Sequence, residues 1–241
     1  MATNPHIGAA TPPVEQELAS VHRFYAALSP LIHPETGLGG KLLYAGELDQ
    51  YGSRLVRAAN IAGAATLAAS ANAAALRQAM RDGVIDFLVT SLDEALRILK
   101  NEIRKRQTVA VAVSLAPEVI LEEMLDRGVL PDLLPITSLP TASEAVLCTF
   151  VDQGAQRIQA QPLLPGKQFL ILPIPAQFAQ SPAAFDALLR SHLPPDDHAA
   201  HRWLRLSPRY LGTQARRLRT LACSPQTASK LLEILGPSAQ Q

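Results

Sequence analysis

The stretch Lys41-Leu42-Leu43-Tyr44-Ala45-Gly46 decides the fold of this chain. An apolar run that ends in glycine, followed by apolar residues at helical spacing, is typical of the first strand and turn of a β-α unit. The same alternation recurs as far as about residue 140, so further strands are expected at Ala64–Ala69, Phe87–Val89, Val109–Val113 and Asp132–Ile136. This order predicts an α/β fold with a doubly wound, mostly parallel sheet.

Helix signals lie between the expected strands. Ser91 and Glu94 have the spacing of a capping box at the start of an expected helix, Ser91–Arg106. Pro117 suits the first turn of a helix that continues through Glu118–Arg127. Other helices are expected at Val14–Leu28, Ser53–Ala62 and Ala71–Arg81. Strands and helices in this order indicate a Rossmann-like sheet.

The texture of the sequence changes after Pro140. Proline becomes frequent, and only Phe169–Ile174 has the pattern of a strand. Helices are expected at Ser143–Gln153, Pro182–Ser191, Ala199–Leu206, Gly212–Leu221 and Gln226–Leu235. We therefore divide the chain into an N-terminal tail and helix (1–36), a Rossmann-like domain (37–140) and an α-rich C-terminal extension (141–241) packed on or beside it.

The composition excludes several classes of partner. With 22 Lys and Arg against 21 Asp and Glu, the chain has no overall attraction for nucleic acid or for an anionic membrane. No apolar run has the length needed to cross a bilayer, and the N-terminus lacks the basic and apolar regions of a secretory signal. We therefore expect a cytoplasmic protein, with Cys148 and Cys223 as reduced, buried thiols.

Two further segments carry a family resemblance. Thr90-Ser91-Leu92-Asp93-Glu94-Ala95-Leu96 and Arg127-Gly128-Val129-Leu130-Pro131-Asp132 resemble phrases of the nucleotide-binding domain of urocanase (urocanate hydratase). The resemblance covers roughly 100 residues after Gly39. It implies a Rossmann-like domain whose family cofactor is NAD, held at a glycine-rich loop after the first strand.

The positions that carry chemistry in that family differ here. The loop after Gly46 continues Glu47-Leu48-Asp49-Gln50-Tyr51-Gly52, so two carboxylates stand where a diphosphate would sit. Ala69 stands where a Rossmann-type site has an acid for the ribose. Neither cysteine lies in the context of the urocanase catalytic cysteine. We therefore predict no urocanate hydratase activity for this chain alone, no catalytic residues and no bound cofactor.

Ligands of open α/β sheets bind at the carboxyl ends of the strands, where the order of the strands reverses. The candidate crevice positions in this chain are Gly46, Ser70, Ser114 and Thr137. No metal ligands are assigned. His198 and His201 follow Asp196-Asp197, a pattern that favours an aspartate-capped helix with exposed histidines over a metal site.

Two hypotheses for function remain open. The first is a urocanase-like Rossmann-domain protein that binds a small molecule or a protein partner. This hypothesis favours a protein that is not an enzyme. The second is an enzyme of unknown reaction that holds a dinucleotide or phosphate ligand in an altered pose, with help from C-terminal arginines. Formation of a homo-oligomer stays open under either hypothesis. The second requires the tail to fold over the crevice, and its arginines are Arg202, Arg205, Arg209, Arg216, Arg217 and Arg219.

Overall fold

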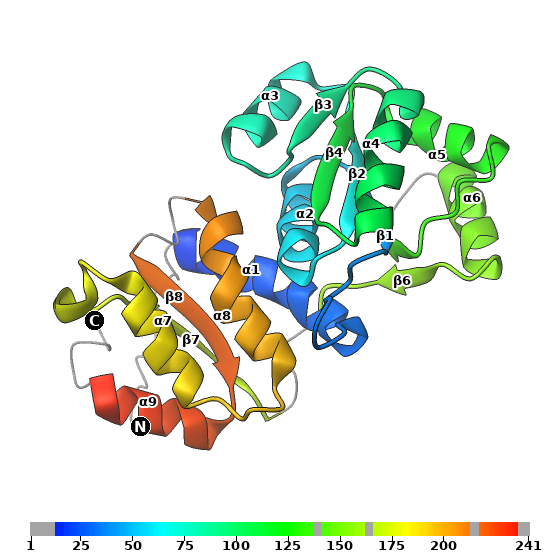
Figure 1. The fold of residues 1–241 in the computed structure, drawn as a ribbon. Helices are drawn as coiled ribbons and strands as arrows, with labels where there is room; N and C mark the ends of the chain where they lie inside the picture. The colour runs from blue at the N-terminus through cyan, green and yellow to red at the C-terminus, as the bar shows by residue number, and fades with distance from the viewer. Residues whose placement is uncertain (1–12, 137–140, 162–165, 213–216, 236–241) are drawn as a thin grey trace, which may run out of the picture.

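The computed structural model describes residues 13–136, 141–161, 166–212 and 217–235. Its main feature is a six-stranded sheet with the order β3-β4-β2-β1-β5-β6, in which every neighbouring pair is parallel (Figure 1). This arrangement confirms the predicted doubly wound α/β fold. The strands are β1 (Leu42–Glu47), β2 (Ala65–Ala69), β3 (Phe87–Val89), β4 (Val109–Val113), β5 (Leu133–Pro135) and β6 (Gln156–Ile158).

Helices cover both faces of the sheet. Successive side chains of a strand point to opposite faces, so Leu43 and Ala45 of β1 pack on one side, and Leu42 and Tyr44 pack on the other. The first face is covered by α1 (Pro13–Leu28), α2 (Gln50–Ala62) and α3 (Ala73–Arg81). The second is covered by α4 (Leu92–Lys105), α5 (Pro117–Asp126) and α6 (Thr141–Asp152).

The rest of the described chain forms a smaller part with a core of its own, which we call the C-terminal lobe (residues 166–235). Its antiparallel pair, β7 and β8, shares this core with three helices, α7, α8 and α9 (Figure 1). The elements are β7 (Gln168–Pro173), a 3₁₀ turn at Ala176–Phe178, α7 (Pro182–Ser191), α8 (His198–Tyr210), β8 (Leu218–Cys223) and α9 (Pro225–Leu235). A further 3₁₀ turn, Ser29–Leu31, follows α1.

Three details differ from the sequence-based prediction. The helix expected at Gly212–Leu221 is wrong, because Leu218–Cys223 is strand β8. Strand β8 pairs along its length with β7, and this tertiary contact overrides the local helix propensity of the segment. Helix α8 continues past Pro208 to Tyr210. The sheet also extends beyond the boundary expected at residue 140, since α6 and β6 continue it to Ile158.

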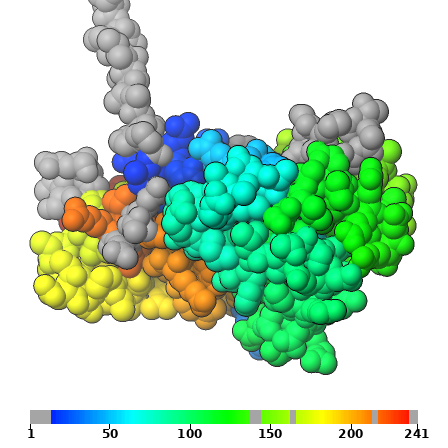
Figure 2. All heavy atoms as spheres, turned by 90° about the horizontal axis from the view of Figure 1, so that it is seen from above, coloured from blue at the N-terminus to red at the C-terminus, as the bar shows by residue number. Residues whose placement is uncertain are grey.

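The C-terminal lobe and the sheet domain lie against each other (Figure 2). Two arginines form hydrogen bonds between these two parts. Arg202 of α8 is buried, and its Nε donates to the carbonyl of Ile61 in the last turn of α2 at 2.8 Å. In the opposite direction, Arg57 of α2 donates to the carbonyl of Tyr210 at the end of α8. Carbonyls in the last turn of a helix lack an intrahelical donor. Each arginine therefore supplies a hydrogen-bond donor to such a carbonyl in a helix of the other part. We call this pair of contacts the arginine clasp.

Candidate functional site

The order of the strands reverses at β1, which lies between β2 and β5. Helix α2 leaves β1 toward one face, and α6 leaves β5 toward the other. Between the carboxyl ends of these two strands lies a cavity of about 410 Å³, which we call the β1/β5 cavity. Its lining comprises Tyr44, Gly46, Glu47, Asp49, Tyr51, Pro117, Leu121, Pro135, Ile136 and Leu147.

Two glycines shape the loop beside the β1/β5 cavity. Gly46 has a φ of +76°, a conformation that favours glycine, and it lies at an irregularity in the pairing of β1 with β2. Gly52 lies in the first turn of α2, where a Cβ would come within 1.9 Å of the Glu47 carbonyl oxygen. Gly52 therefore lets α2 approach the end of β1 closely, as the last glycine of a Rossmann loop does.

The amino end of α2 already carries an anion of its own. Asp49 is the N-cap, and its Oδ1 accepts a hydrogen bond from the backbone N–H of Gly52 at 2.8 Å. Glu47 is exposed nearby and has no hydrogen-bond or ion-pair partner among the described residues. A diphosphate at this helix end would have to displace one carboxylate and lie against another, which like-charge repulsion opposes.

Two tyrosines hold the walls of the cavity together. The hydroxyl of the buried Tyr44 donates to the Pro117 carbonyl at 2.8 Å, and that of Tyr51 donates to the Ile136 carbonyl at 3.0 Å. Burial raises the pKa of both phenols, with smaller contributions from Glu118 and Glu47 at Tyr44 and from Asp49 at Tyr51. Both hydroxyls therefore remain protonated donors at neutral pH, and both already have acceptors.

The predicted crevice positions lie on different strands. Gly46 lines the β1/β5 cavity. Ser70 follows β2, is fully buried, and accepts from the Asn72 N–H, while Asn72 itself caps α3. Ser114 follows β4 and is exposed. Thr137 lies outside the described residues. Of the three described positions, only Gly46 is therefore part of this cavity.

A polar groove of about 520 Å³ lies on the other side of the amino end of α2, between α1, α2 and α3. It shares Asp49 with the β1/β5 cavity. Several of its polar groups already have partners: Glu17 pairs with Arg54 at 2.6 Å, and Arg57 is part of the arginine clasp. The groove consequently offers fewer free polar groups than its size suggests.

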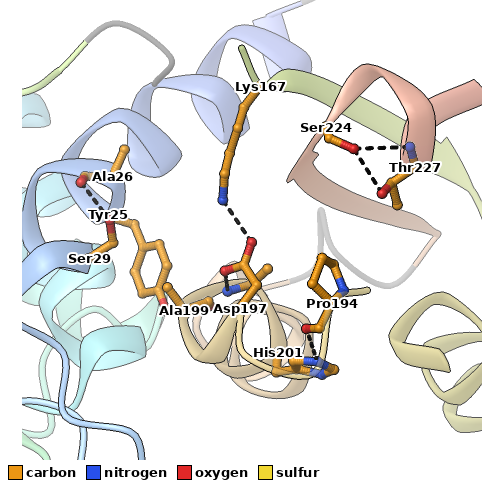
Figure 3. Close-up of polar contacts among 11 residues, drawn as sticks. Tyr25, Ala26, Ser29, Lys167, Pro194, Asp197, Ala199, His201, Ser224 and Thr227 are labelled. Carbon is orange, nitrogen blue, oxygen red and sulfur yellow. Dashed lines mark hydrogen bonds and ion pairs between the residues drawn. The ribbon is translucent and has the colours of Figure 1, made fainter. Parts of the chain in front are cut away.

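A third hollow lies where α1 and α8 meet beside Lys167. Lys167 points at Asp197 and pairs with it at 2.8 Å, and the Tyr25 hydroxyl donates to the Ala199 carbonyl (Figure 3). The hollow also contacts His22, whose pKa burial lowers to about 3, with Lys167 adding to the effect. Its volume of about 20 Å³ has room for a single water molecule, so it is no ligand site.

The described residues contain no group of three His, Cys, Asp or Glu side chains placed to hold a metal ion. Asp197 caps α8 and His198 is exposed, as the sequence predicted, whereas His201 is half-buried and its Nε2 lies 3.0 Å from the Pro194 carbonyl oxygen. The expectation of two buried thiols is wrong for Cys148, which lies on the exposed side of α6. Cys223 is buried, and burial raises its pKa to about 11, which makes it a poor nucleophile.

Two arginines of the C-terminal lobe, Arg202 and Arg219, have structural partners of their own, and Arg217 is exposed just before β8. Arg202 bonds Ile61 near the amino ends of the strands, opposite the β1/β5 cavity. Arg219 is buried and pairs with Asp186 inside the lobe. Arg205 and Arg209 are exposed on α8, and Arg216 lies outside the described residues.

Comparison with known families agrees with this geometry. The model of the urocanase Rossmann-like domain matches residues 23–157. The chain belongs to the urocanase family. The match runs from within α1 to β6, so this urocanase Rossmann-like domain includes parts of the chain on both sides of the predicted domain, 37–140.

Most side chains that line the cavity of this urocanase-family domain were not singled out from the sequence. Tyr44 and Tyr51 lie within segments that were quoted for their glycines and carboxylates. Tyr44 could have been noticed because it is an aromatic residue inside the first strand, and a buried tyrosine usually has a hydrogen-bond partner for its hydroxyl. Pro117 and Leu147 come from α5 and α6, and only the strand order brings them to β1.

Among the described helices, none combines the length and the apolar character needed to span a bilayer.

Proposed function

We propose that this urocanase-family protein is a binding module that takes a small ligand in the β1/β5 cavity, without urocanate hydratase activity of its own and without the usual NAD mode. The observation that carries the proposal is Asp49, which caps α2 with its own carboxylate. A Rossmann-like domain binds a diphosphate with the free N–H groups of this helix end. Here that end is already compensated, while a cavity suited to a small ligand remains beside it.

The competing proposal, an enzyme that holds a phosphate ligand with C-terminal arginines, has less support. Arg202 and Arg219 are buried and engaged with Ile61 and Asp186. The β1/β5 cavity has no arginine, lysine or histidine among its described lining residues. A phosphate ligand at this cavity would therefore meet carboxylates without a compensating cation.

A screen of small fragments by ligand-observed NMR tests the proposal. Gly46→Trp is expected to abolish binding, because the new side chain would occupy the cavity that Gly46 lines. Gly128→Trp is the matched control: Gly128 also has a positive φ (+63°), and a Cβ there meets no atom within 4 Å. If Gly46→Trp has no effect and Arg216→Ala removes binding, the ligand lies on the C-terminal arginines and the proposal fails.

A further inference from the structure

The β1/β5 cavity has a specific chemical character, because its described side chains present acceptors and negative charge over an apolar floor. From this we infer that its ligand is an organic cation, namely a protonated amine carried on a small apolar or aromatic body. The inference rests on the proposed function and names the class of ligand for the same site.

The floor of the cavity calls for an apolar body. Pro117, Leu121, Pro135 and Leu147 line it together with the buried ring of Tyr44. These side chains come from β1, α5, β5 and α6, so they form a concave surface at the junction of four elements. Cavities of this size bury most of a small ligand, and apolar walls supply most of the favourable contact.

The polar groups of the cavity call for a ligand that donates hydrogen bonds. The hydroxyls of Tyr44 and Tyr51 already donate to the carbonyls of Pro117 and Ile136. The remaining side-chain groups in the lining are the carboxylates of Glu47 and Asp49, which can only accept when ionised. Asp49 uses one oxygen as the cap of α2, and Glu47 has no described partner. An ammonium group matches this set, because it carries three donors and a positive charge.

The same groups argue against other ligands. An anion would meet two carboxylates without a cation, and a metal ion would find two carboxylates where a protein site supplies more oxygen ligands. The cavity therefore discriminates by charge at its rim and by apolar contact at its floor.

Three probes of similar shape test the inference: benzylamine, which is protonated at neutral pH, benzyl alcohol, which is neutral, and benzoate, which is an anion. Their dissociation constants are measured by ligand-observed NMR titration of the full chain. Benzylamine is expected to bind roughly tenfold more tightly than benzyl alcohol, because two partly solvated carboxylates can stabilise its ammonium group by about that factor. Benzoate is expected to bind weakest.

Charge-neutral variants locate the effect. Glu47→Gln and Asp49→Asn keep the size of each side chain, and asparagine remains a good N-cap, so α2 keeps its start. The double variant is expected to remove the preference for benzylamine over benzyl alcohol. Glu233→Gln is the control, because it removes one exposed carboxylate from α9, outside the cavity lining. Loss of the preference in Glu233→Gln would mean that net charge alone attracts the amine, which overturns the inference.

The outcomes separate this inference from the proposed function. If benzyl alcohol binds as tightly as benzylamine, and Gly46→Trp abolishes both, the cavity binds ligands but does not select cations, and only the inference is overturned. If no probe binds, or if Gly46→Trp leaves all binding unchanged, the site is not in this cavity and both fail. If benzoate binds best, the carboxylates do not set the preference, and the inference is wrong.

Discussion

The arginine clasp can be broken by adding a single methyl group. Gly63 follows α2 with a φ of +99°, and a Cβ at this position would lie 2.3 Å from Nη2 of Arg202. Gly63→Ala should therefore push the guanidinium away from the carbonyl of Ile61, which it now bonds through Nε. Gly83→Ala provides the matched control, because Gly83 has a φ of +64° and its added Cβ would meet no atom within 4 Å.

The magnitude follows from two separate costs. Alanine in the left-handed region costs about 1–2 kcal/mol at either position, because its Cβ approaches a carbonyl oxygen. At Gly63 the displaced guanidinium also leaves the Ile61 carbonyl buried without a donor, which costs about 1–3 kcal/mol more. Taking about 2 kcal/mol for this second cost, Gly63→Ala should melt roughly 4–8 °C below Gly83→Ala.

Urea denaturation and thermal melting of four variants measure this difference: Gly63→Ala, Gly83→Ala, Arg202→Ala and the double variant Gly63→Ala/Arg202→Ala. In the Arg202→Ala background the cost of Gly63→Ala should fall to that of Gly83→Ala, because the clash is gone. The reasoning is refuted if Gly63→Ala and Gly83→Ala destabilise the protein equally. In that case the hydrogen bond from Arg202 to the Ile61 carbonyl either survives the substitution or contributes little to stability.

Three further predictions concern pH and ligands. Because His22 has its pKa lowered to about 3 by burial, the unfolded chain binds a proton that the native chain does not, so stability should fall by about 2 kcal/mol between about pH 8 and about pH 5. His22→Phe, which keeps a ring against Phe169 and Trp203, should flatten this dependence in urea titrations, and an unchanged slope would contradict the assignment to His22. Calorimetry should show no NAD binding in the micromolar range; saturable binding there would mean that Asp49 does not block the helix end. Urocanate absorbance should not decrease above a heat-killed control, with or without added NAD, and a decrease in a preparation free of host urocanase would disprove the loss of activity.

The sheet could be predicted because its signals are local. Val109–Val113 and Phe87–Val89 occur in the structure with the bounds read from the sequence, since each is an apolar run between helix caps. The cap at Ser91 was also visible, and its Oγ accepts from the Glu94 N–H at 3.3 Å. Strand β8 could not be predicted in this way, because its partner β7 lies about 50 residues earlier, and only their pairing makes Leu218–Cys223 extended.

The site could be predicted only in part, because a cavity depends on which strands become neighbours. Gly46 was found from its place after the first strand, and it lines the β1/β5 cavity. Ser70 and Ser114 also follow strands, but β2 and β4 lie on the other side of β1 from β5. The order of the strands is set by long-range packing, and no local spacing encodes it. The lining from α5 and α6 was hidden for the same reason.

Helix α2 links these observations, because the chain compensates both of its ends internally. A helix carries partial positive charge at its amino end and partial negative charge at its carboxyl end. Asp49 caps the first end, and Arg202 from the C-terminal lobe bonds the second. A domain that binds a diphosphate leaves the amino end free for its ligand. With this end compensated, the charge that a ligand meets at the β1/β5 cavity comes from Glu47 and Asp49, so the preference of the cavity turns from anions toward cations.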